Sequence, residues 1–248
     1  MKNPRTLILT GDGINCEIET AFACRLAGFE AEIRHINDLI AEKISQTDLE
    51  SRFDLLVLPG GFSFGDELGS GRVLALKLIH GLKWDLEKFT QKNKLVLGIC
   101  NGFQALIQMK VFGSDLSITH NQSGRFINTW VHLKVTSHGA TLNPWLKELT
   151  ELDLPIRHGE GRILTLNSKL ESPHRHAAFE YDQDVNGSLD QIAGLTNANG
   201  KILGLMPHPE AFVRPSQHPN AASIINEEAT LGLKLFQNAF SFFQERSL

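Results

Sequence analysis

Short apolar runs alternate along this chain with stretches whose apolar residues recur at helical spacing. The runs predict buried strands at Thr6–Leu9, Ala31–Ile36, Leu55–Leu58, Leu95–Ile99 and Ile202–Leu205. The other stretches predict helices at Glu17–Ala27, Gly69–Ile79 and Glu227–Glu245. Strands that alternate with helices form mostly parallel sheets that helices cover on both faces. The pattern therefore predicts an α/β fold with a mostly parallel sheet flanked by helices.

The pattern changes in the second half of the chain. From Asn128 to Thr136, and again around Ile163–Leu166, apolar and polar residues alternate. Alternation is typical of a strand with one face in solvent, so we expect small antiparallel additions to the sheet. The 248 residues show no internal repeat, low-complexity tract or linker. Because α/β folds often run to about 200–250 residues undivided, we expect a single domain over residues 1–248.

Composition narrows the class of protein. A net charge of −4 and a pI near 6.2 give no basic footprint for nucleic acid. No apolar run approaches the roughly 20 residues of a membrane helix, and no signal peptide precedes the first strand. Three cysteines without regular spacing argue against a disulfide framework and for a reducing compartment. We expect a cytoplasmic enzyme with no nucleic-acid or membrane partner.

A lone cysteine, Cys100, separates the strand Leu95–Ile99 from a run with helical spacing. At such a strand-to-helix turn a nucleophile is held in a sharp elbow, and Gly98 and Gly102 let the backbone fold tightly around it. The helix N-terminus also favours the thiolate over the thiol. The alternative is a buried structural cysteine, which the flanking glycines disfavour.

The segment Met206–Glu210 contains the partners that a cysteine nucleophile needs. A thiolate requires a base, and the base requires a third group that fixes its tautomer. His208 and Glu210 lie two residues apart, so extended backbone would place both side chains on one face. Pro207 and Pro209 keep this segment out of a helix. With Cys100, the pair forms a Cys-His-Glu triad hypothesis.

Further segments lie in the same order as in a known family. They are Gly11–Glu17, Pro59–Asp66, Gly98–Gln104, Arg157–Arg162, Asn186–Ser188 and Pro207–Glu210. Together they resemble class I glutamine amidotransferases, which have a flavodoxin-like fold. The finer resemblance is to the glutaminase subunits of phosphoribosylformylglycinamidine synthase, a purine-pathway enzyme. It implies that Cys100, His208 and Glu210 free ammonia from glutamine.

The resemblance also implies roles for other residues and for partners. One N–H of the pair Gly60 and Gly61 would form an oxyanion hole with the N–H of Asn101, and Gln104 would help to hold the substrate's side-chain amide. The partners implied are a synthetase subunit, which converts formylglycinamide ribonucleotide with ATP and Mg²⁺, and a small bridging subunit. No cofactor is implied for this chain, which lacks the G-x-x-x-x-G-K-[ST] phosphate loop.

Three alternatives are weighed against this interpretation. His158-Gly159-Glu160 has the H-x-E shape of zinc deaminases, but no Pro-Cys-x-x-Cys follows, and Cys16 and Cys24 lack metal-ligand spacing. We therefore expect no metal site. A glutaminase subunit of another synthetase is disfavoured by Pro59–Asp66 and Arg157–Arg162. A Cys-elbow stress or redox protein would lack the downstream His-Pro-Glu.

Overall fold

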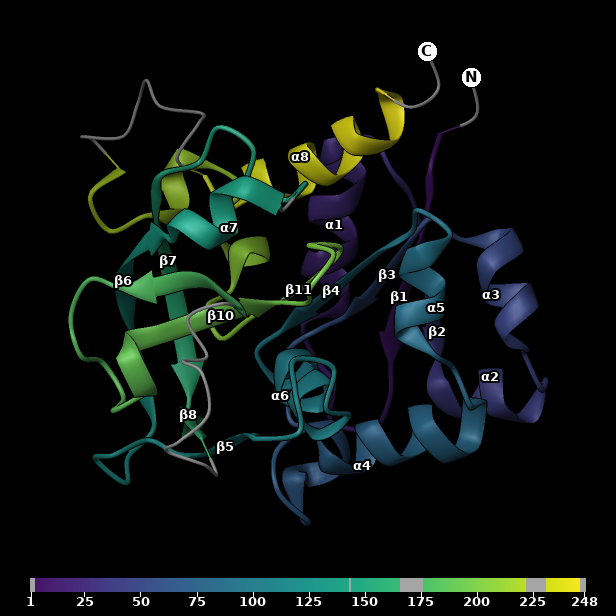
Figure 1. Cartoon of the computed structure of the whole chain (residues 1–248), viewed down its shortest axis with the longest axis horizontal. Coiled ribbons are helices and arrows are strands. Elements are labelled where there is room, and N and C mark those ends of the chain that lie inside the picture. Colours follow the sequence, from purple (N-terminus) through teal and green to yellow (C-terminus); the bar gives the residue numbers. More distant parts are fainter. Residues whose placement is uncertain (1–2, 143, 166–175, 222–230, 246–248) are drawn as a thin grey trace.

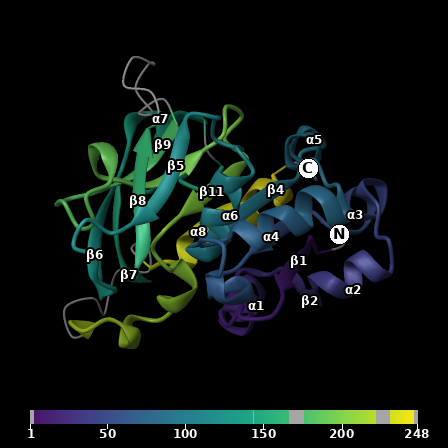
Figure 2. The ribbon, with the colours of Figure 1, turned by 90° about the horizontal axis from the view of Figure 1, so that it is seen from below.

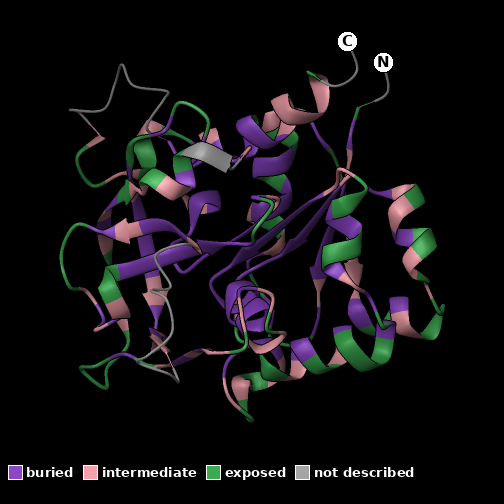
Figure 3. Ribbon diagram, in the orientation of Figure 1, coloured by how far each residue is buried: buried purple, intermediate pink, exposed green. Residues whose placement is uncertain are grey.

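Nine strands form one sheet in the part of the chain that the computed structural model describes, residues 3–142, 144–165, 176–221 and 231–245. Its strand order is β2-β1-β3-β4-β11-β10-β9-β6-β7, and it runs through the middle of the molecule in Figure 1. Figure 3 shows that the central strands are almost wholly buried, whereas exposed residues gather on the outer helices and loops.

The first five strands of this order are parallel. Their bounds are Glu30–His35 (β2), Arg5–Thr10 (β1), Leu55–Leu58 (β3), Leu95–Ile99 (β4) and Ile202–Leu205 (β11). Strands β3, β4 and β11 carry no exposed residue, as expected for a parallel sheet that is covered on both faces. This is the predicted flavodoxin-like core. Ligands of such a sheet bind beyond the carboxyl ends of its strands.

Antiparallel strands extend this core on the side of β11. They are Ile192–Thr196 (β10), Ala177–Tyr181 (β9), Ile127–Val135 (β6) and Glu151–His158 (β7). A separate two-stranded ribbon pairs Leu116–His120 (β5) with Glu160–Thr165 (β8). The predicted antiparallel additions are therefore confirmed, and they are larger than the alternating stretches alone indicated.

Helices cover the sheet on both sides. Their bounds are Glu17–Ala27 (α1), Ile36–Ala41 (α2), Gln46–Arg52 (α3), Arg72–Leu76 (α4), Leu86–Gln91 (α5), Asn101–Gln108 (α6), Ser137–Leu142 (α7) and Leu233–Gln244 (α8). Helix α1 packs against α8, while α4 packs against α6 at the other side of the sheet (Figure 1). The view in Figure 2 shows α4 and α6 in front of the sheet and α8 behind it. No helix among the described residues is long and apolar enough to cross a membrane.

Several predicted boundaries are wrong, for local reasons. The helix predicted at Gly69–Ile79 begins at Arg72, because Gly69 and Gly71 have φ values of +103° and +71° that make a turn; it continues as a π-helix at Lys77–Leu82. The strand predicted to end at Ile36 ends at His35, whose ring nitrogen accepts the Asn37 N–H and caps α2.

The last helix is shorter than predicted. It begins at Leu233, because Gly232 packs directly on the Pro209 carbonyl. Residues 227–230 of the predicted helix, and residue 166 at the end of the predicted alternation, lie outside the described residues.

Candidate active site

Cys100 is held in a strained turn at the end of β4. Its backbone has φ 48° and ψ −103°, a conformation that costs a non-glycine residue about 1–3 kcal/mol. Its N–H donates to the Leu205 carbonyl at 2.8 Å, and its own carbonyl accepts from the N–H of Gln104 at 2.9 Å. Cys100 is the N-cap of α6, so the free N–H groups of the first turn surround it. The predicted elbow is therefore present.

Gly102 explains why the helix starts so close to the sheet. A β-carbon at this position would overlap the carbonyl of Leu58, the last residue of β3. Only glycine allows the first turn of α6 to lie against the end of this strand. The turn therefore brings the Cys100 elbow next to the segment that follows β3, which begins with Pro59, Gly60 and Gly61.

His208 and Glu210 form a buried hydrogen-bonded pair after β11. The Nδ1 atom of His208 lies 2.7 Å from Oε1 of Glu210, and the two residues are 2% and 1% exposed. The backbone N–H of His208 donates to the Pro155 carbonyl at 2.9 Å, which ties this segment to β7. The ring nitrogen Nε2 is buried and has no hydrogen-bond partner in the described part of the chain. The carboxylate thus orients the imidazole and leaves Nε2 for the reacting groups.

Gly60 lies where these elements meet. A β-carbon on Gly60 would stand 2.8 Å from Cε1 of His208, 3.4 Å from the Cβ of Cys100 and 3.3 Å from the Sγ of Cys16. The loops after β1, β3, β4 and β11 therefore converge on one point beyond the carboxyl ends of the parallel strands. Cys16 is a second thiol at this point.

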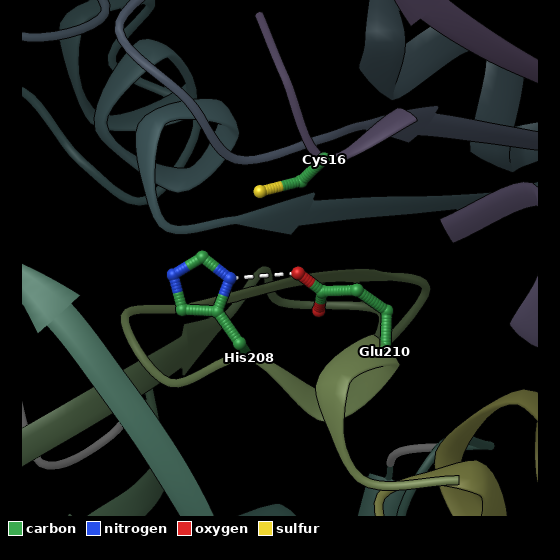
Figure 4. Close-up of side chains that lie close together, drawn as sticks. All are labelled: Cys16, His208 and Glu210. Carbon is green, nitrogen blue, oxygen red and sulfur yellow. Dashed lines mark hydrogen bonds and ion pairs between the residues drawn. The ribbon is translucent and has the colours of Figure 1, made fainter. Parts of the chain in front are cut away.

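The Cys16 thiol faces the triad pair in Figure 4. Its Sγ, a ring nitrogen of His208 and a carboxylate oxygen of Glu210 all lie within 4.8 Å of one another. Thiolate, imidazole and carboxylate are groups that bind zinc. Here, however, Oε1 of Glu210 is bound to the imidazole, and burial raises the pKa of the Cys16 thiol above its ordinary value, which favours the neutral form.

The electrostatic environment of His208 favours its protonated form. Burial by itself lowers the pKa of His208, but the negative charges of Glu210 and of the Cys100 thiolate outweigh it. They raise this pKa well above the ordinary value. A protonated imidazole beside a thiolate is the ion pair that activates a cysteine nucleophile.

A pocket of about 170 Å³ opens on the Cys100 side of His208. Its lining residues are Asn15, Cys16, Gly61, Phe62, Cys100, Phe126, Asn128, Arg157 and His208. Phe62 and Phe126 are about half exposed, with accessible fractions of 49% and 54%. The two rings therefore form an apolar rim around a polar base. Such a combination suits a small polar substrate with an aliphatic stem.

The two glycines after β3 differ in their relation to this pocket. The Gly60 carbonyl accepts the Cys16 N–H at 3.3 Å, and the Phe62 N–H donates to the Gly13 carbonyl at 2.8 Å. In a trans peptide the N–H points opposite to the carbonyl, so the Gly61 N–H points away from the Gly13–Cys16 segment. Gly61 also lines the pocket, so of the two glycine N–H groups its own is the better placed to meet a ligand there.

The Asn101 side chain joins the elbow to the loop that contains Gly61. Its Oδ1 accepts the Ser63 N–H at 3.1 Å, and its Nδ2 donates to Asp66 and Gln104 at 2.9 Å each. The Gln104 amide in turn donates to the Glu160 carbonyl at 2.6 Å. Gln104 is buried and is not among the pocket-lining residues. Its predicted contact with the substrate amide stays a prediction, and its observed contacts brace the elbow.

The segment His158–Arg162 connects two strands through Gly159. His158 ends β7 and Glu160 begins β8. The His158 ring pairs with Oδ1 of Asn121 at 3.0 Å and is buried beneath Gly161. Burial, together with the positive charge of His208, lowers the pKa of His158 to about 4, so the ring is neutral at pH 7.

The structure brings Cys100, His208, Glu210, both glycines and Asn101 close together, while their roles stay a prediction. Sequence reasoning missed Cys16 and Arg157 as members of the site. Both lie in segments that carry the family resemblance, but cysteine spacing was tested only for a metal centre, and an arginine beside a histidine has no chemical signature of its own. Their positions follow from the convergence of the loop before α1 and of strand β7 on the elbow, which no local pattern contains.

Comparisons with known proteins place this arrangement in a family. Residues 3–243 match the model of the CobB/CobQ-like glutamine amidotransferase domain. The chain is 38% identical to phosphoribosylformylglycinamidine synthase subunit PurQ of Dehalococcoides mccartyi, over 99% of this chain and 100% of that protein. It is 36% identical to the PurQ subunit of Methanococcus maripaludis, over 98% and 99%. The chain belongs to the PurQ family of glutamine amidotransferases.

Solved structures agree with this assignment. A chain of the PurLQS structure from Thermotoga maritima superposes with a TM-score of 0.76 at 30% identity, covering 98% of this chain and all of that one. A GMP synthase-like protein from Thermoplasma acidophilum superposes with a TM-score of 0.60 at 16% identity, covering all of this chain and 98% of that one, which shows the shared fold alone. The predicted PurQ-type glutamine amidotransferase fold is confirmed.

Proposed function

We propose that this PurQ-type chain is the glutaminase subunit of a phosphoribosylformylglycinamidine synthase. It hydrolyses glutamine to glutamate and ammonia, and the ammonia passes to a synthetase subunit that converts formylglycinamide ribonucleotide to formylglycinamidine ribonucleotide. The single observation that supports this most strongly is the convergence of Cys100, His208 and Gly60 beside a pocket, in a chain whose full length matches PurQ subunits.

In the proposed reaction the Cys100 thiolate attacks the side-chain carbonyl carbon of glutamine. The C–N bond breaks, and the leaving ammonia takes the proton of His208, which becomes neutral. Neutral His208 then removes a proton from water, which attacks the γ-glutamyl thioester and releases glutamate. Glu210 keeps the imidazole in the correct tautomer and stabilises its charged form.

Both steps pass through a tetrahedral oxyanion, which needs preformed donors. We assign them to the N–H of Asn101, at the first position of α6, and to the N–H of Gly61. The choice of Gly61 over Gly60 is supported by the peptide orientation and by the position of Gly61 at the pocket. Asn101 has two roles in this proposal. Its backbone N–H is a donor to the oxyanion, and its side chain fixes the loop that carries the second donor.

The other reactants belong to partners in this proposal. ATP and Mg²⁺ act on the synthetase subunit, and a small third subunit bridges the two. Ammonia released into water would be protonated and lost to the reaction. We therefore expect the glutaminase pocket to open toward the synthetase in the assembled enzyme, and no cofactor to act in this chain.

The test compares two nitrogen sources in the assembled enzyme. Cys100→Ser removes the nucleophile, so glutamine-dependent product formation should fall by at least about 10⁴-fold, whereas product formation with added ammonia should persist. The Cys16→Ser enzyme serves as the matched thiol control and should keep glutamine-dependent turnover well above the level of Cys100→Ser. Loss of the ammonia-dependent reaction in a correctly assembled Cys100→Ser complex would contradict the proposal.

A further inference from the structure

Arg157 brings a permanent positive charge to the pocket. It is the next-to-last residue of β7 and lines the same pocket as Cys100. Its backbone carbonyl lies 3.9 Å from the Cys100 Sγ, so the two residues are direct neighbours. The guanidinium nitrogen Nη2 is buried and has no hydrogen-bond partner in the part of the chain that the structure describes. The proposed mechanism gives this group no role.

The pocket that Arg157 lines has no carboxylate to balance this charge. Its other lining residues are asparagines, cysteines, phenylalanines, a glycine and His208, with no aspartate or glutamate among them. A buried guanidinium N–H without a partner is destabilising, because it has lost its water and gained no acceptor. Such a group is typical of a site whose missing acceptor is an anionic ligand.

The α-carboxylate of glutamine is an anion at the end of the substrate that lies away from Cys100. The amide of glutamine must reach Cys100, which leaves the α-carboxylate and α-ammonium at the outer part of the pocket. A guanidinium binds a carboxylate through two parallel N–H···O hydrogen bonds, a geometry that lysine cannot reproduce. Asn128 lies directly across from Arg157 in the β6–β7 pairing and also lines the pocket. Its amide oxygen is an acceptor suited to the ammonium.

We propose that Arg157 binds the α-carboxylate of glutamine and thereby selects the free amino acid over amides that lack this carboxylate. This inference rests on the proposed glutaminase function. It makes Arg157 a specificity-determining residue that acts on substrate binding, while the chemistry at Cys100 proceeds through the triad and the oxyanion donors.

The experiment measures alkylation of Cys100 in the full chain, with two electrophiles that differ in the carboxylate. 6-Diazo-5-oxo-L-norleucine carries the α-carboxylate of glutamine, whereas iodoacetamide has none. In Arg157→Gln the labelling rate with the diazo-ketone should fall about 10- to 100-fold, the range expected for hydrogen bonds to a charged group. The rate with iodoacetamide should stay at the wild-type value. The diazo-ketone labelling rate of Arg157→Lys should lie between those of the wild type and Arg157→Gln, since lysine keeps the positive charge but cannot donate two parallel hydrogen bonds.

Arg125→Gln is the matched control, because Arg125 is an exposed arginine just before β6 and does not line the pocket. It should label like the wild type with both reagents. An equal fall for both electrophiles in Arg157→Gln, or no fall with the diazo-ketone, would overturn the inference. Glutamine turnover by the assembled wild-type enzyme is measured in parallel. Its absence would count against the proposed function, whatever the result at Arg157.

Discussion

The His208 ring occupies the space that a side chain on Gly60 would fill. Its Cε1 atom lies 2.8 Å from the position of a β-carbon on that glycine, a distance that real Cβ atoms essentially never show. The absence of a side chain at Gly60 therefore decides how close the imidazole comes to the strand end that carries Cys100. The glycine pair after β3 has two distinct functions in our proposal, a close approach at Gly60 and an N–H donor at Gly61.

This relationship predicts that Gly60→Ala impairs catalysis with little effect on the fold. The new methyl group must displace the imidazole, because the atom it meets belongs to a ring held by Glu210, on a residue whose backbone N–H donates to the Pro155 carbonyl. A misplacement of about 1 Å costs on the order of 10²-fold in rate, and we expect a fall of that size in glutaminase kcat. The measurement is steady-state turnover of the assembled enzyme, with the thermal midpoint recorded alongside.

Gly69→Ala provides the opposite signature as a control. A β-carbon there meets nothing within 4 Å, but φ of +103° is strained for alanine, so stability should fall by about 1–3 kcal/mol while turnover stays close to wild type. If Gly60→Ala behaved like Gly69→Ala, with lower stability and normal turnover, the proposed contact between Gly60 and His208 would not govern catalysis.

A second prediction concerns the three thiols. A glutamine-like diazo-ketone should label Cys100 and leave Cys16 and Cys24 largely unmodified. Burial raises the pKa of the Cys16 thiol and, more strongly, that of the Cys24 thiol, so both stay protonated near pH 7 and react slowly. Cys24 is also completely buried, whereas Cys100 lies at the pocket and at a helix N-terminus. Peptide mapping by mass spectrometry gives the distribution of the label.

Cys16→Ala sharpens this test because Cys16 lines the same pocket. Label on Cys100 should persist in this variant and disappear in Cys100→Ser. If the wild type carried the label mainly on Cys16, or if the Cys16→Ala variant carried no label, the second thiol would be the nucleophile.

The parallel half of the fold was predictable because its signals are local. The strands Leu55–Leu58 and Leu95–Ile99 are apolar throughout, and both lie within the predicted bounds. The helix Glu17–Ala27 also has its predicted bounds, and Gly28 ends it in the left-handed conformation that glycine favours. In each case one short stretch of sequence contains the cause of the structure.

The antiparallel half and the outer part of the site were less predictable. In β7 the residues Leu152, Leu154 and Ile156 alternate with less apolar positions, but the pairing of this strand with β6 depends on a register that the sequence does not state. Asn15 and Cys16 enter the pocket from the loop after β1, and Arg157 enters it from strand β7, only because these distant segments converge. The chemistry of Cys100 and His208 is visible in their own neighbourhoods, but that of Arg157 is not.

A third prediction concerns the pH dependence of catalysis. Burial lowers the pKa of His208, but the negative charges of Glu210 and Cys100 raise it well above its ordinary value. Glu210→Gln removes one of these charges, so the pKa falls and less imidazolium is available to protonate the leaving ammonia. We expect kcat to fall by about 10²–10⁴-fold and the alkaline limb of its pH profile to move to lower pH.

The folding stability should also depend on pH through the raised pKa of His208. A raised histidine pKa stabilises the fold below the unfolded value of about 6.5, and this stabilisation is lost as pH rises through the folded pKa. The difference in stability between wild type and Glu210→Gln should thus be largest in acid and shrink at alkaline pH. Glu148→Gln, which removes an exposed carboxylate that pairs with Lys234, is the control and should leave the pH profile of kcat in place. An unmoved alkaline limb in Glu210→Gln would show that the carboxylate does not set the charge of His208.

A fourth prediction concerns stability in acid and has the opposite sign. Burial and the charge of His208 lower the pKa of His158 to about 4, so in the folded state this ring stays neutral where the unfolded chain, with a value of about 6.5, binds a proton. The folded state therefore loses stability as pH falls from 6.5 toward 4, by about 2 kcal/mol between pH 7 and pH 5.

His158→Asn removes the titrating group and keeps an amide near Nδ1 for Asn121. At pH 7 the variant should be the less stable protein, because it loses ring packing against Gly161. Between pH 7 and pH 5 that deficit should narrow by about 2 kcal/mol, since only the wild type carries the protonation penalty. Urea unfolding at pH 7, 6 and 5, analysed at equal slopes, measures the difference directly. A deficit that stayed constant across this range would mean that His158 titrates alike in both states, and the neutral ring beside His208 would lose its electrostatic explanation.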